Sequence, residues 1–229
     1  MLSAIVCVNS NWGIGYKGEL LYSFKEDMDF FKSMTLPSSR FEPAKTVIMG
    51  RKTADSLPNG FLKDRKNIII SNDPERKTDL YALDRAIVIP GSQIIVTPHI
   101  SRIMYQYDGE EGTKPDAFVI GGASIYEEFL PECKYVYLTY VNDDTTEADT
   151  FLKLPNDVKY ILKGTCLRGD FLDRKSGKTY EVVTLKLLNP RKKNPIDISY
   201  GNSIYDEVVK HKTLYEHIQN FIGLPTSSN

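Results

Sequence analysis

Asp27 occupies the most unusual position among the residues of this sequence that could do chemistry. Residues 23–34 carry hydrophobic side chains at helical spacing, and at 100° per residue Asp27 falls inside the hydrophobic arc formed by Phe24, Met28, Phe30, Phe31 and Met34. An unpaired carboxylate there is costly and burial raises its pKa, so the pattern predicts a polar partner. One interpretation is a buried acid that binds a polar heterocycle in an aromatic cleft. The other is an acid near a helix start that meets only the helix dipole or a backbone N–H group.

A Gly-x-Gly-x-x-Gly motif spans residues 13–18, directly after a predicted strand. In a Rossmann fold the last glycine lies inside the following helix, whose N-terminus faces pyrophosphate. Here the next helix start signal comes later, where Ser23 and Glu26 form a predicted capping box. The strand over 46–49 is also followed by no acidic residue that could bind a ribose hydroxyl. We therefore expect these glycines in a mobile loop over a site.

Two predicted strand-to-helix junctions have the composition of phosphate-binding sites. Residues 50–53 offer backbone N–H groups, two cations and a hydroxyl, and residues 121–122 form a Gly-Gly turn through which backbone can approach a ligand closely. The competing interpretations are a solvated basic surface for the first and a plain tight turn for the second. Two such sites in one sheet favour a dinucleotide across the strand ends, and the strand end at 70–72 suggests one of the NADP type.

The elements that must position these groups follow from short β-branched runs that alternate with helical patterns. Several runs are hydrophobic on both faces, which is typical of strands covered by helices on both sides. The pattern predicts an α/β fold with a largely parallel, doubly wound sheet whose last strands are antiparallel. The predicted strands are 2–8, 46–49, 68–70, 87–89, 94–96, 117–120, 135–140 and 180–187, and the predicted helices are 24–34, a weak one after Thr53, 100–105 and 123–130.

A change of composition at residues 189–195, with two prolines and a basic run, predicts a linker. We expect one domain over residues 1–189, followed over 190–229 by the linker and an amphipathic helical extension of unknown role. Its hydrophobic stripe either packs on its own domain or contacts another protein.

The overall composition excludes several classes of protein. The 229 residues are 41% hydrophobic and 26% charged, with a net charge of −1, which excludes collagen, wholesale disorder and a highly basic nucleic-acid binder. No hydrophobic run is long enough to cross a membrane, and the first residues lack the features of a signal peptide. Three widely spaced cysteines and three scattered histidines give no metal site, disulfide framework or histidine triad. We expect a cytoplasmic protein without a metal, a nucleic-acid partner or a membrane partner.

Taken in this order, the segments over residues 2–188 resemble the dihydrofolate reductase family. The resemblance is carried by motifs that share both residue types and spacing. They are Gly13-Ile14-Gly15-x-x-Gly18-x-Leu20, Asp27-Met28-x-x-Phe31-Lys32-x-x-Thr35, Val47-Ile48-Met49-Gly50-Arg51-Lys52-Thr53, Leu62-x-x-Arg65-Lys66-Asn67-Ile68-Ile69, Val119-Ile120-Gly121-Gly122-Ala123-x-Ile125-Tyr126, Leu138-Thr139 and Asp149-Thr150-Phe151.

The resemblance implies a central eight-stranded, mostly parallel sheet with an antiparallel C-terminal strand and flanking helices, to which the C-terminal helical extension is added. It implies that hydride passes from NADPH to C6 of a dihydropterin while N5 is protonated. The expected activity is the reduction of 7,8-dihydrofolate to 5,6,7,8-tetrahydrofolate for one-carbon metabolism and thymidylate and purine synthesis. The expected enzyme is a monomer, and its C-terminal helix is a candidate protein contact.

The resemblance also implies roles for individual residues. Asp27 would bind the pterin 2-amino group and a ring nitrogen with help from Thr139, and Tyr22 would hold the water molecule that donates the proton. Arg65 would clamp the glutamate α-carboxylate, the Gly121-Gly122 peptide would be cis, and the loop over residues 9–20 would close over nicotinamide. The implied substrate contacts are Ile5, Phe31, Leu57, Leu62, Arg65 and Ile120. The implied cofactor contacts are Cys7, Ile14, Gly15, Gly50, Arg51, Lys52, Thr53, Ser71, Asn72, Gly121, Gly122, Ala123, Ser124, Ile125 and Tyr126.

The sequence departs from the family pattern at several positions. Leu21-Tyr22 stands where the family usually has Pro-Trp, Ala54 stands where it has Trp, and Lys63-Asp64 replaces Pro-Gly. Two alternatives therefore accompany the main interpretation. One is the pyrimidine reductase of riboflavin synthesis, which has the same fold but lacks the buried helix acid. The other is a non-catalytic structural relative.

Overall fold

The computed structural model describes residues 1–71, 86–89, 92–97, 103, 117–153, 159–172 and 177–188. The predicted linker and helix of residues 190–229, Asn72, and all of the predicted helix 100–105 except Ile103 lie outside the described residues. The elements, in chain order, are β1 (Leu2–Val8), β2 (Gly13–Tyr16), β3 (Glu19–Leu20), α1 (Lys25–Thr35), β4 (Thr46–Gly50), α2 (Arg51–Ser56), β5 (Lys66–Ile70), β6 (Ala86–Ile89), β7 (Ser92–Thr97), β8 (Ala117–Val119), α4 (Ala123–Phe129), the 3₁₀ turn η1 (Leu130–Glu132), β9 (Tyr135–Val141), β10 (Thr150–Phe151), β11 (Lys159–Leu172) and β12 (Thr179–Leu188).

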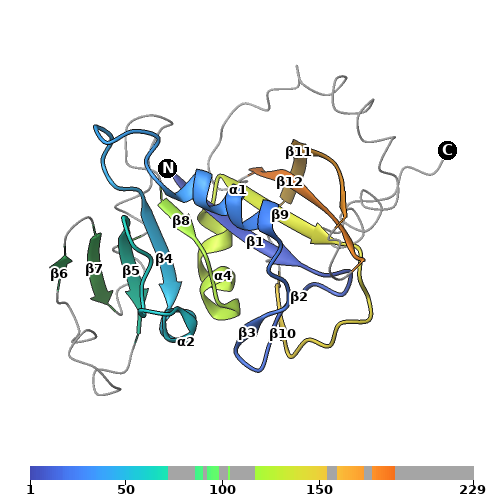
Figure 1. The fold of residues 1–229 in the computed structure, drawn as a ribbon, viewed down its shortest axis with the longest axis horizontal. Helices are drawn as coiled ribbons and strands as arrows, with labels where there is room; N and C mark the ends of the chain where they lie inside the picture. Colours follow the sequence, from blue (N-terminus) through green and yellow to red (C-terminus); the bar gives the residue numbers. More distant parts are fainter. Residues whose placement is uncertain are drawn as a thin grey trace.

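The main sheet has the order β11-β12-β9-β1-β8-β4-β5-β7-β6 among the described residues (Figure 1). The pairs from β9 to β7 are parallel, whereas β12 is antiparallel to β9 and β11 to β12. The predicted α/β class and its antiparallel C-terminal edge are confirmed. All eight predicted runs form strands of this sheet.

The predicted count of eight strands is wrong, because β11 adds a ninth. Glycines and charged residues interrupt the hydrophobic residues of β11, so the sequence shows no strand pattern there. Its pairing with β12 has three register shifts, the first between Leu162 and Gly164. Such bulges break the alternation on which strand prediction depends.

β1 lies in the middle of the sheet, between the parallel strands β8 and β9. Six of its seven residues are buried, which fits its hydrophobic character on both faces. Its register places Ile5 opposite Tyr137 and Cys7 opposite Thr139. The central strand therefore carries side chains directly into the neighbourhood of Thr139.

A small second sheet joins β10, β2 and β3. The glycine motif of residues 13–18 forms the β2–β3 hairpin, with Lys17 at φ 51° and Gly18 at φ 86° at its tip. Glycine adopts this left-handed conformation without a steric cost, which explains its place at the turn. The motif opens no helix, so the expectation that it is not a Rossmann turn is confirmed.

α1 packs across β9 and β12. The Phe30 ring meets Tyr137 edge-on at 6.1 Å, and the Phe24 ring stacks on Tyr180 at 4.4 Å. The predicted capping box is wrong, since the N-cap is Phe24 and no side chain caps the helix. Glu26 instead accepts a hydrogen bond of 2.9 Å from the Tyr180 hydroxyl. The burial of Phe24 against β12 thus fixes the extended residue that precedes the helix.

Candidate active site

Asp27 is half-buried in the first turn of α1 and faces β9. Its Oδ1 accepts a hydrogen bond of 2.5 Å from the hydroxyl of Thr139, which is buried. Burial raises the pKa of Asp27, and the bond from Thr139 lowers it by a smaller amount. Among the described residues Oδ2 accepts no hydrogen bond. The carboxylate is thus fixed through one oxygen while the other can accept from a ligand.

Cys7 lies beside this carboxylate, because β1 pairs Cys7 with Thr139. Burial raises the pKa of its thiol well above the usual value, and the charge of Asp27 raises it further. The thiol is therefore protonated at neutral pH and is no nucleophile. It can contribute to the site only as a small uncharged surface.

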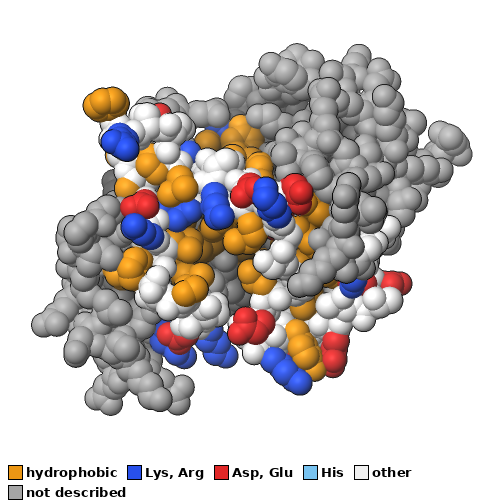
Figure 2. Space-filling view, in the orientation of Figure 1, with side chains coloured by type: hydrophobic (Ala, Val, Ile, Leu, Met, Phe, Trp, Pro, Cys, Tyr) orange, Lys and Arg blue, Asp and Glu red, His pale blue; other side chains and the backbone are white. Residues whose placement is uncertain are grey.

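Hydrophobic side chains line the space between α1 and α2 (Figure 2). Leu57, Leu62 and Ile120 pack with their inner parts against the core cluster around Met49, and each remains partly exposed. Phe61 belongs to the same group, although the sequence analysis did not single it out. Ile5, at 8% exposure, and the half-buried Phe31 contribute from β1 and α1. These residues can provide the hydrophobic walls of a cleft.

Arg65 is buried at 6% exposure between α1 and β5. Its Nε donates to Thr35 Oγ1 at 2.9 Å, one Nη donates to the Lys63 carbonyl at 2.7 Å, and the guanidinium lies 5.9 Å from the Phe31 ring centre. Among the described residues, these bonds use two of its five N–H groups. A cation held in this way can bind a carboxylate with the remaining donors.

Asn67 holds the loop that carries Leu62 and Arg65. Its fully buried side chain accepts from the Leu62 backbone N–H at 2.8 Å and donates to the Leu62 and Arg65 carbonyls at 2.9 and 3.1 Å. The sequence analysis quoted Asn67 in a motif but gave it no role. Its position two residues after Arg65, at the start of a buried strand, is the available signal.

The two glycine junctions meet at the ends of β4 and β8. Gly50 N donates to Gly121 O at 2.7 Å, and the Gly121–Gly122 peptide is cis, as the resemblance implied. Gly121 has φ +111°, and a Cβ on it would lie 3.1 Å from the ring of Tyr126. A Cβ on Gly50 would lie 3.0 Å from Ile125. Only glycine fits this close approach without displacement of its neighbours.

The remaining predicted cofactor residues divide into two groups. Lys52, Thr53, Ala123 and Ser124 are exposed or half-buried in the first turns of α2 and α4, whereas Ile125, Tyr126 and Ser71 are buried. The Tyr126 hydroxyl donates to the Ile5 carbonyl at 2.6 Å, which links α4 to β1. Arg51 forms an ion pair of 2.6 Å with Asp55 one helical turn later.

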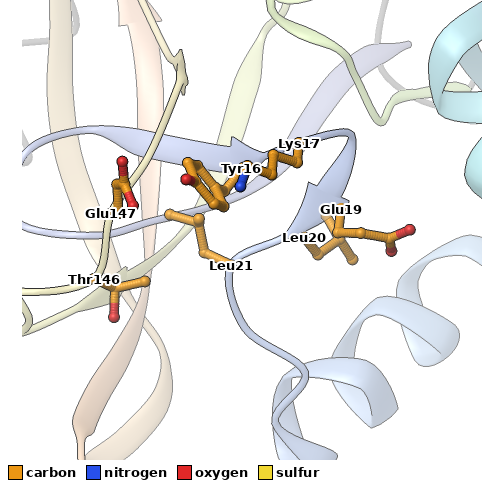
Figure 3. A pocket seen from close by; sticks show the side chains of 7 residues that line it. All are labelled: Tyr16, Lys17, Glu19, Leu20, Leu21, Thr146 and Glu147. Carbon is orange, nitrogen blue, oxygen red and sulfur yellow. The ribbon is translucent and has the colours of Figure 1, made fainter.

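The hairpin places Ile14 and Gly15 on β2, both half-buried. A cavity of about 450 Å³ lies on this part of the molecule, lined by Tyr16, Lys17, Glu19, Leu20, Leu21, Thr146 and Glu147. Figure 3 shows Tyr16 and Leu21 between the loop of Thr146 and Glu147 on one side and β3 on the other. This cavity does not include Asp27 or the glycine junctions.

Tyr22 has a partner that the sequence did not predict. Its hydroxyl donates to Asp143 Oδ2 at 2.6 Å, and this bond together with burial raises the pKa of the phenol. Among the described residues, no side chains form a cluster suited to a metal ion, and no helix is long and hydrophobic enough to span a membrane.

Comparison with known proteins identifies the family to which this chain belongs. A family model described as dihydrofolate reductase matches residues 1–186. The chain belongs to the dihydrofolate reductase family. This reductase is 33% identical to the dihydrofolate reductase of Schistosoma mansoni over 66% of this chain and 76% of that protein. It is 33% identical to that of Candida albicans over 62% of this chain and 70% of that protein.

A bifunctional dihydrofolate reductase-thymidylate synthase from Daucus carota is 34% identical to this reductase over 66% of this chain, but the match covers 28% of that protein. The solved structure of dihydrofolate reductase from Enterococcus faecalis, complexed with NADP(H), matches with a TM-score of 0.59 at 23% identity. The match covers 82% of this chain and 96% of that one, which shows that the fold is shared.

Family membership confirms the activity and the cofactor that the resemblance implied. The chain is an oxidoreductase that reduces 7,8-dihydrofolate with NADPH. The match is to the dihydrofolate reductase family, and the helix acid that the riboflavin-pathway alternative would lack is present and half-buried.

Proposed function

We propose that the space between α1, α2 and the β2–β3 hairpin is where this reductase acts, with Asp27 and Thr139 at its centre. The observation that carries the proposal is the half-buried Asp27 carboxylate, held by Thr139 through Oδ1 and with Oδ2 open to a further donor. A pterin presents an amino group and a ring N–H side by side. A carboxylate can accept from both through two parallel hydrogen bonds.

The rest of the substrate would lie along the hydrophobic walls and end at Arg65. The pteridine and benzoyl rings would contact Ile5, Phe31, Leu57, Leu62 and Ile120, which are buried or half-buried. Arg65 would hold the glutamate α-carboxylate with the donors that Thr35 and Lys63 leave. Contacts at both ends fix the substrate along its length, which reduces the entropic cost of reaching the reactive geometry.

The cofactor would lie across the ends of β4 and β8. A side chain on Gly50 would meet Ile125 and one on Gly121 would meet Tyr126, so these positions stay without side chains and the backbone N–H groups after them can face pyrophosphate. Arg51, Lys52 and Thr53 would bind the phosphates, with Ser71 and Asn72 on the adenosine side. Ala123 and Ser124 would contribute at the start of α4, while Ile125 and Tyr126 would support Gly50 and Gly121 from behind. When bound, NADPH supplies the hydride.

The proton would come from water rather than from Asp27. A carboxylate bound to the 2-amino edge of the pterin lies away from N5, so we assign Asp27 to orienting and polarising the substrate. Tyr22 would stand beside the water molecule that donates the proton. Its O–H donates to Asp143, so its phenolic oxygen would serve that water as an acceptor.

The hairpin would close over the nicotinamide. Ile14, Gly15 and Cys7 would contact its ring, and closure would exclude bulk water while the single water molecule beside Tyr22 stays in place. We also propose that the enzyme acts as a monomer in the cytoplasm. The basis for that compartment is the sequence, whose three widely spaced cysteines form no disulfide framework.

The experiment that tests this function is an assay of dihydrofolate-dependent NADPH oxidation with the purified chain. We expect turnover with dihydrofolate and none with the pyrimidine substrate of riboflavin synthesis. Absence of turnover with both, from a folded chain that binds NADPH, would favour the non-catalytic alternative.

A further inference from the structure

Asp143 is a buried carboxylate that the proposed reaction does not use. It lies two residues after β9, with 4% of its side chain exposed. It accepts from the Tyr22 hydroxyl at 2.6 Å and from the backbone N–H and hydroxyl of Thr145 at 2.9 and 2.7 Å. The Thr146 hydroxyl and the Lys178 ammonium also donate to it. So many donors around a charge that has no part in the proposed substrate and cofactor contacts indicate a role in holding other segments together.

The segments that meet at Asp143 include both ends of residues 9–22, the loop that contains the β2–β3 hairpin. At the start of the loop, Ser10 N donates to the Asp143 carbonyl at 3.0 Å, and Asp143 N donates to Ser10 Oγ at 3.1 Å. Next to it, Asn9 Nδ2 donates to the Thr146 carbonyl at 3.3 Å. At the end of the loop, the Tyr22 hydroxyl binds the carboxylate itself. The β2–β3 hairpin is thus anchored at both ends to one short segment.

The same cluster reaches the helix that carries Asp27 through a stack of side chains. The Lys178 ammonium lies 5.6 Å from the centre of the Tyr22 ring, which stacks on Phe24 at 5.3 Å. Phe24 in turn stacks on Tyr180 at 4.4 Å, with 8° between the ring planes. Because Phe24 is the N-cap of α1, the stack fixes the residue from which the first turn of the helix starts.

We propose that Asp143, paired with Lys178, is a positioning residue for hydride transfer that fixes both the hairpin and the start of α1. In the proposed function the hairpin would contact the nicotinamide and Asp27 would bind the pterin, so the two together set how the reacting rings lie. An error of about 1 Å in such placements can cost up to 100-fold in rate. The inference rests on the proposed function for its kinetic consequence, whereas the anchoring is a property of the chain alone.

The variants that test this proposal remove one contact at a time. Tyr22→Phe removes only the hydroxyl and keeps the ring in the stack, so it leaves the packing intact. Asp143→Asn and Lys178→Met each remove one charge, and Lys178→Arg keeps the cation as the conservative replacement. Lys25→Met is the matched control, because it removes a lysine from an exposed ion pair of 2.9 Å with Asp29 on the same helix.

The kinetic measurement is the single-turnover rate of hydride transfer from NADPH and from its deuterated form. We expect Asp143→Asn, Lys178→Met and Tyr22→Phe to slow the isotope-sensitive step by about 10- to 100-fold, with dihydrofolate affinity unchanged. Lys178→Arg should recover most of the rate, and Lys25→Met should match the wild type. An unchanged hydride step in folded Tyr22→Phe and Asp143→Asn would overturn the proposal. So would an equal loss of rate and substrate affinity.

Hydrogen exchange of the free protein separates this proposal from the proposed function. Asp143→Asn should speed amide exchange within residues 9–26 and leave β4 and β5 at wild-type rates. Uniformly faster exchange would indicate a loss of global stability and would overturn the positioning role. If the wild-type chain oxidises no NADPH, the proposed function fails, and the exchange pattern alone then decides whether Asp143 anchors the loop.

Discussion

The half-buried Asp27 and the buried Asp143 of this reductase have pKa values that move in opposite directions. Among the described residues Asp27 accepts one hydrogen bond, from Thr139, and burial raises its pKa. Asp143 is surrounded by donors, and the bonds from Lys178, Thr146, Tyr22 and Thr145 outweigh burial and hold its pKa well below the usual range. The difference follows from the number of donors each receives. Asp27 is left with capacity for a ligand, whereas Asp143 is saturated by the protein.

At Asp27 we predict opposite effects of one substitution on activity and stability. Asp27→Asn should lose about 10²- to 10⁴-fold in kcat/KM at neutral pH and recover partly at acid pH, where the substrate itself is protonated. Because folding raises the pKa of Asp27, ionisation of this carboxyl group favours the unfolded state. The free energy of unfolding therefore decreases as the pH rises from the pKa of the unfolded state through that of the folded state. Asn carries no charge, so the variant at pH 7 should melt no lower than the wild type.

The control for Asp27→Asn is Asp29→Asn, which changes an exposed acid on the same helix. Its kcat/KM should equal that of the wild type. Full activity of Asp27→Asn at neutral pH, in the same assay, would remove Asp27 from the mechanism.

At Arg65 we predict a loss that depends on the length of the substrate. Arg65→Leu removes the cation proposed for the glutamate carboxylate and should weaken dihydrofolate binding by about 10- to 100-fold. A dihydropterin that lacks the glutamate should bind both forms equally. The measurement is the pair of dissociation constants for each protein. An equal loss for both compounds would contradict the clamp and indicate general damage to the loop that Asn67 holds.

At Arg51 we predict a change in the choice of cofactor. Arg51→Ala should lower the preference for NADPH over NADH by about tenfold or more, since a charged hydrogen bond to the 2′-phosphate is lost. Asp55 forms an ion pair of 2.6 Å with Arg51 and would compete with that phosphate for its guanidinium. Asp55→Ala should therefore keep the preference or increase it. The ratio of kcat/KM for the two cofactors checks both variants, and a constant ratio would reject the contact.

At the scale of elements, the β2–β3 hairpin is held at its tip as well as at its ends. The Lys17 backbone N–H donates to Asp149 Oδ2 at 2.8 Å, and Asp149 N donates to the Gly15 carbonyl at 3.1 Å. The bond from Lys17 holds the pKa of Asp149 below its usual value. One exposed carboxylate thus fixes the turn that would cover the nicotinamide.

We predict that Asp149→Ala loosens this turn and slows hydride transfer by about tenfold, because a bond to a charged acceptor is lost. Asp144→Ala is the control, since Asp144 lies in the same loop and its backbone carbonyl accepts a hydrogen bond from Asn11, which precedes the hairpin. Single-turnover rates and NADPH affinity measure the effect. Equal rates for the two variants would show that the bond at the tip has no part in closure.

The sequence predicts the elements whose side chains repeat with a regular period. The β-branched runs of β1 and β4 end within a residue of their predictions, and the helical period shows that Asp27 lies on the hydrophobic face of α1. β11 escapes prediction because bulges interrupt its alternation with β12. The period of a strand or helix reports burial and is lost wherever the backbone is irregular.

The site is less predictable than the fold because its contacts join residues far apart in the chain. Nothing near Thr139 in the sequence indicates its bond to Asp27, and the family resemblance implied only that both residues serve the pterin. Asp143 lies among Asn, Asp and Thr residues typical of a turn, so its contacts with Tyr22 and Lys178 leave no local pattern. The capping box failed for a similar reason, since the distant Tyr180 decides where α1 begins.

At the scale of the whole molecule, the family match and the main sheet end almost together. The match ends at residue 186 and β12 at Leu188, which supports a catalytic domain over residues 1–189.

We predict that a chain truncated after Leu188 folds and keeps its turnover. A lower melting temperature of the shortened chain would indicate that the hydrophobic stripe of the extension packs on its own domain. An unchanged melting temperature, with loss of a co-purifying protein or with fewer chains per particle in solution, would indicate that the extension contacts another chain. Calorimetry and light scattering distinguish the two, and a shortened chain that does not fold would contradict the proposed boundary.

The position of β1 has a consequence for how the protein is made. β1 is synthesised before both of its neighbours, since Leu2 pairs with Ala117 and Ser3 with Tyr135, which follow more than a hundred residues later. At about 5–20 residues per second this takes roughly 6–23 s, during which a hydrophobic strand has no native neighbour. Formation of the native sheet therefore requires that β1 stay unpaired with other nascent chains until β8 and β9 have been synthesised.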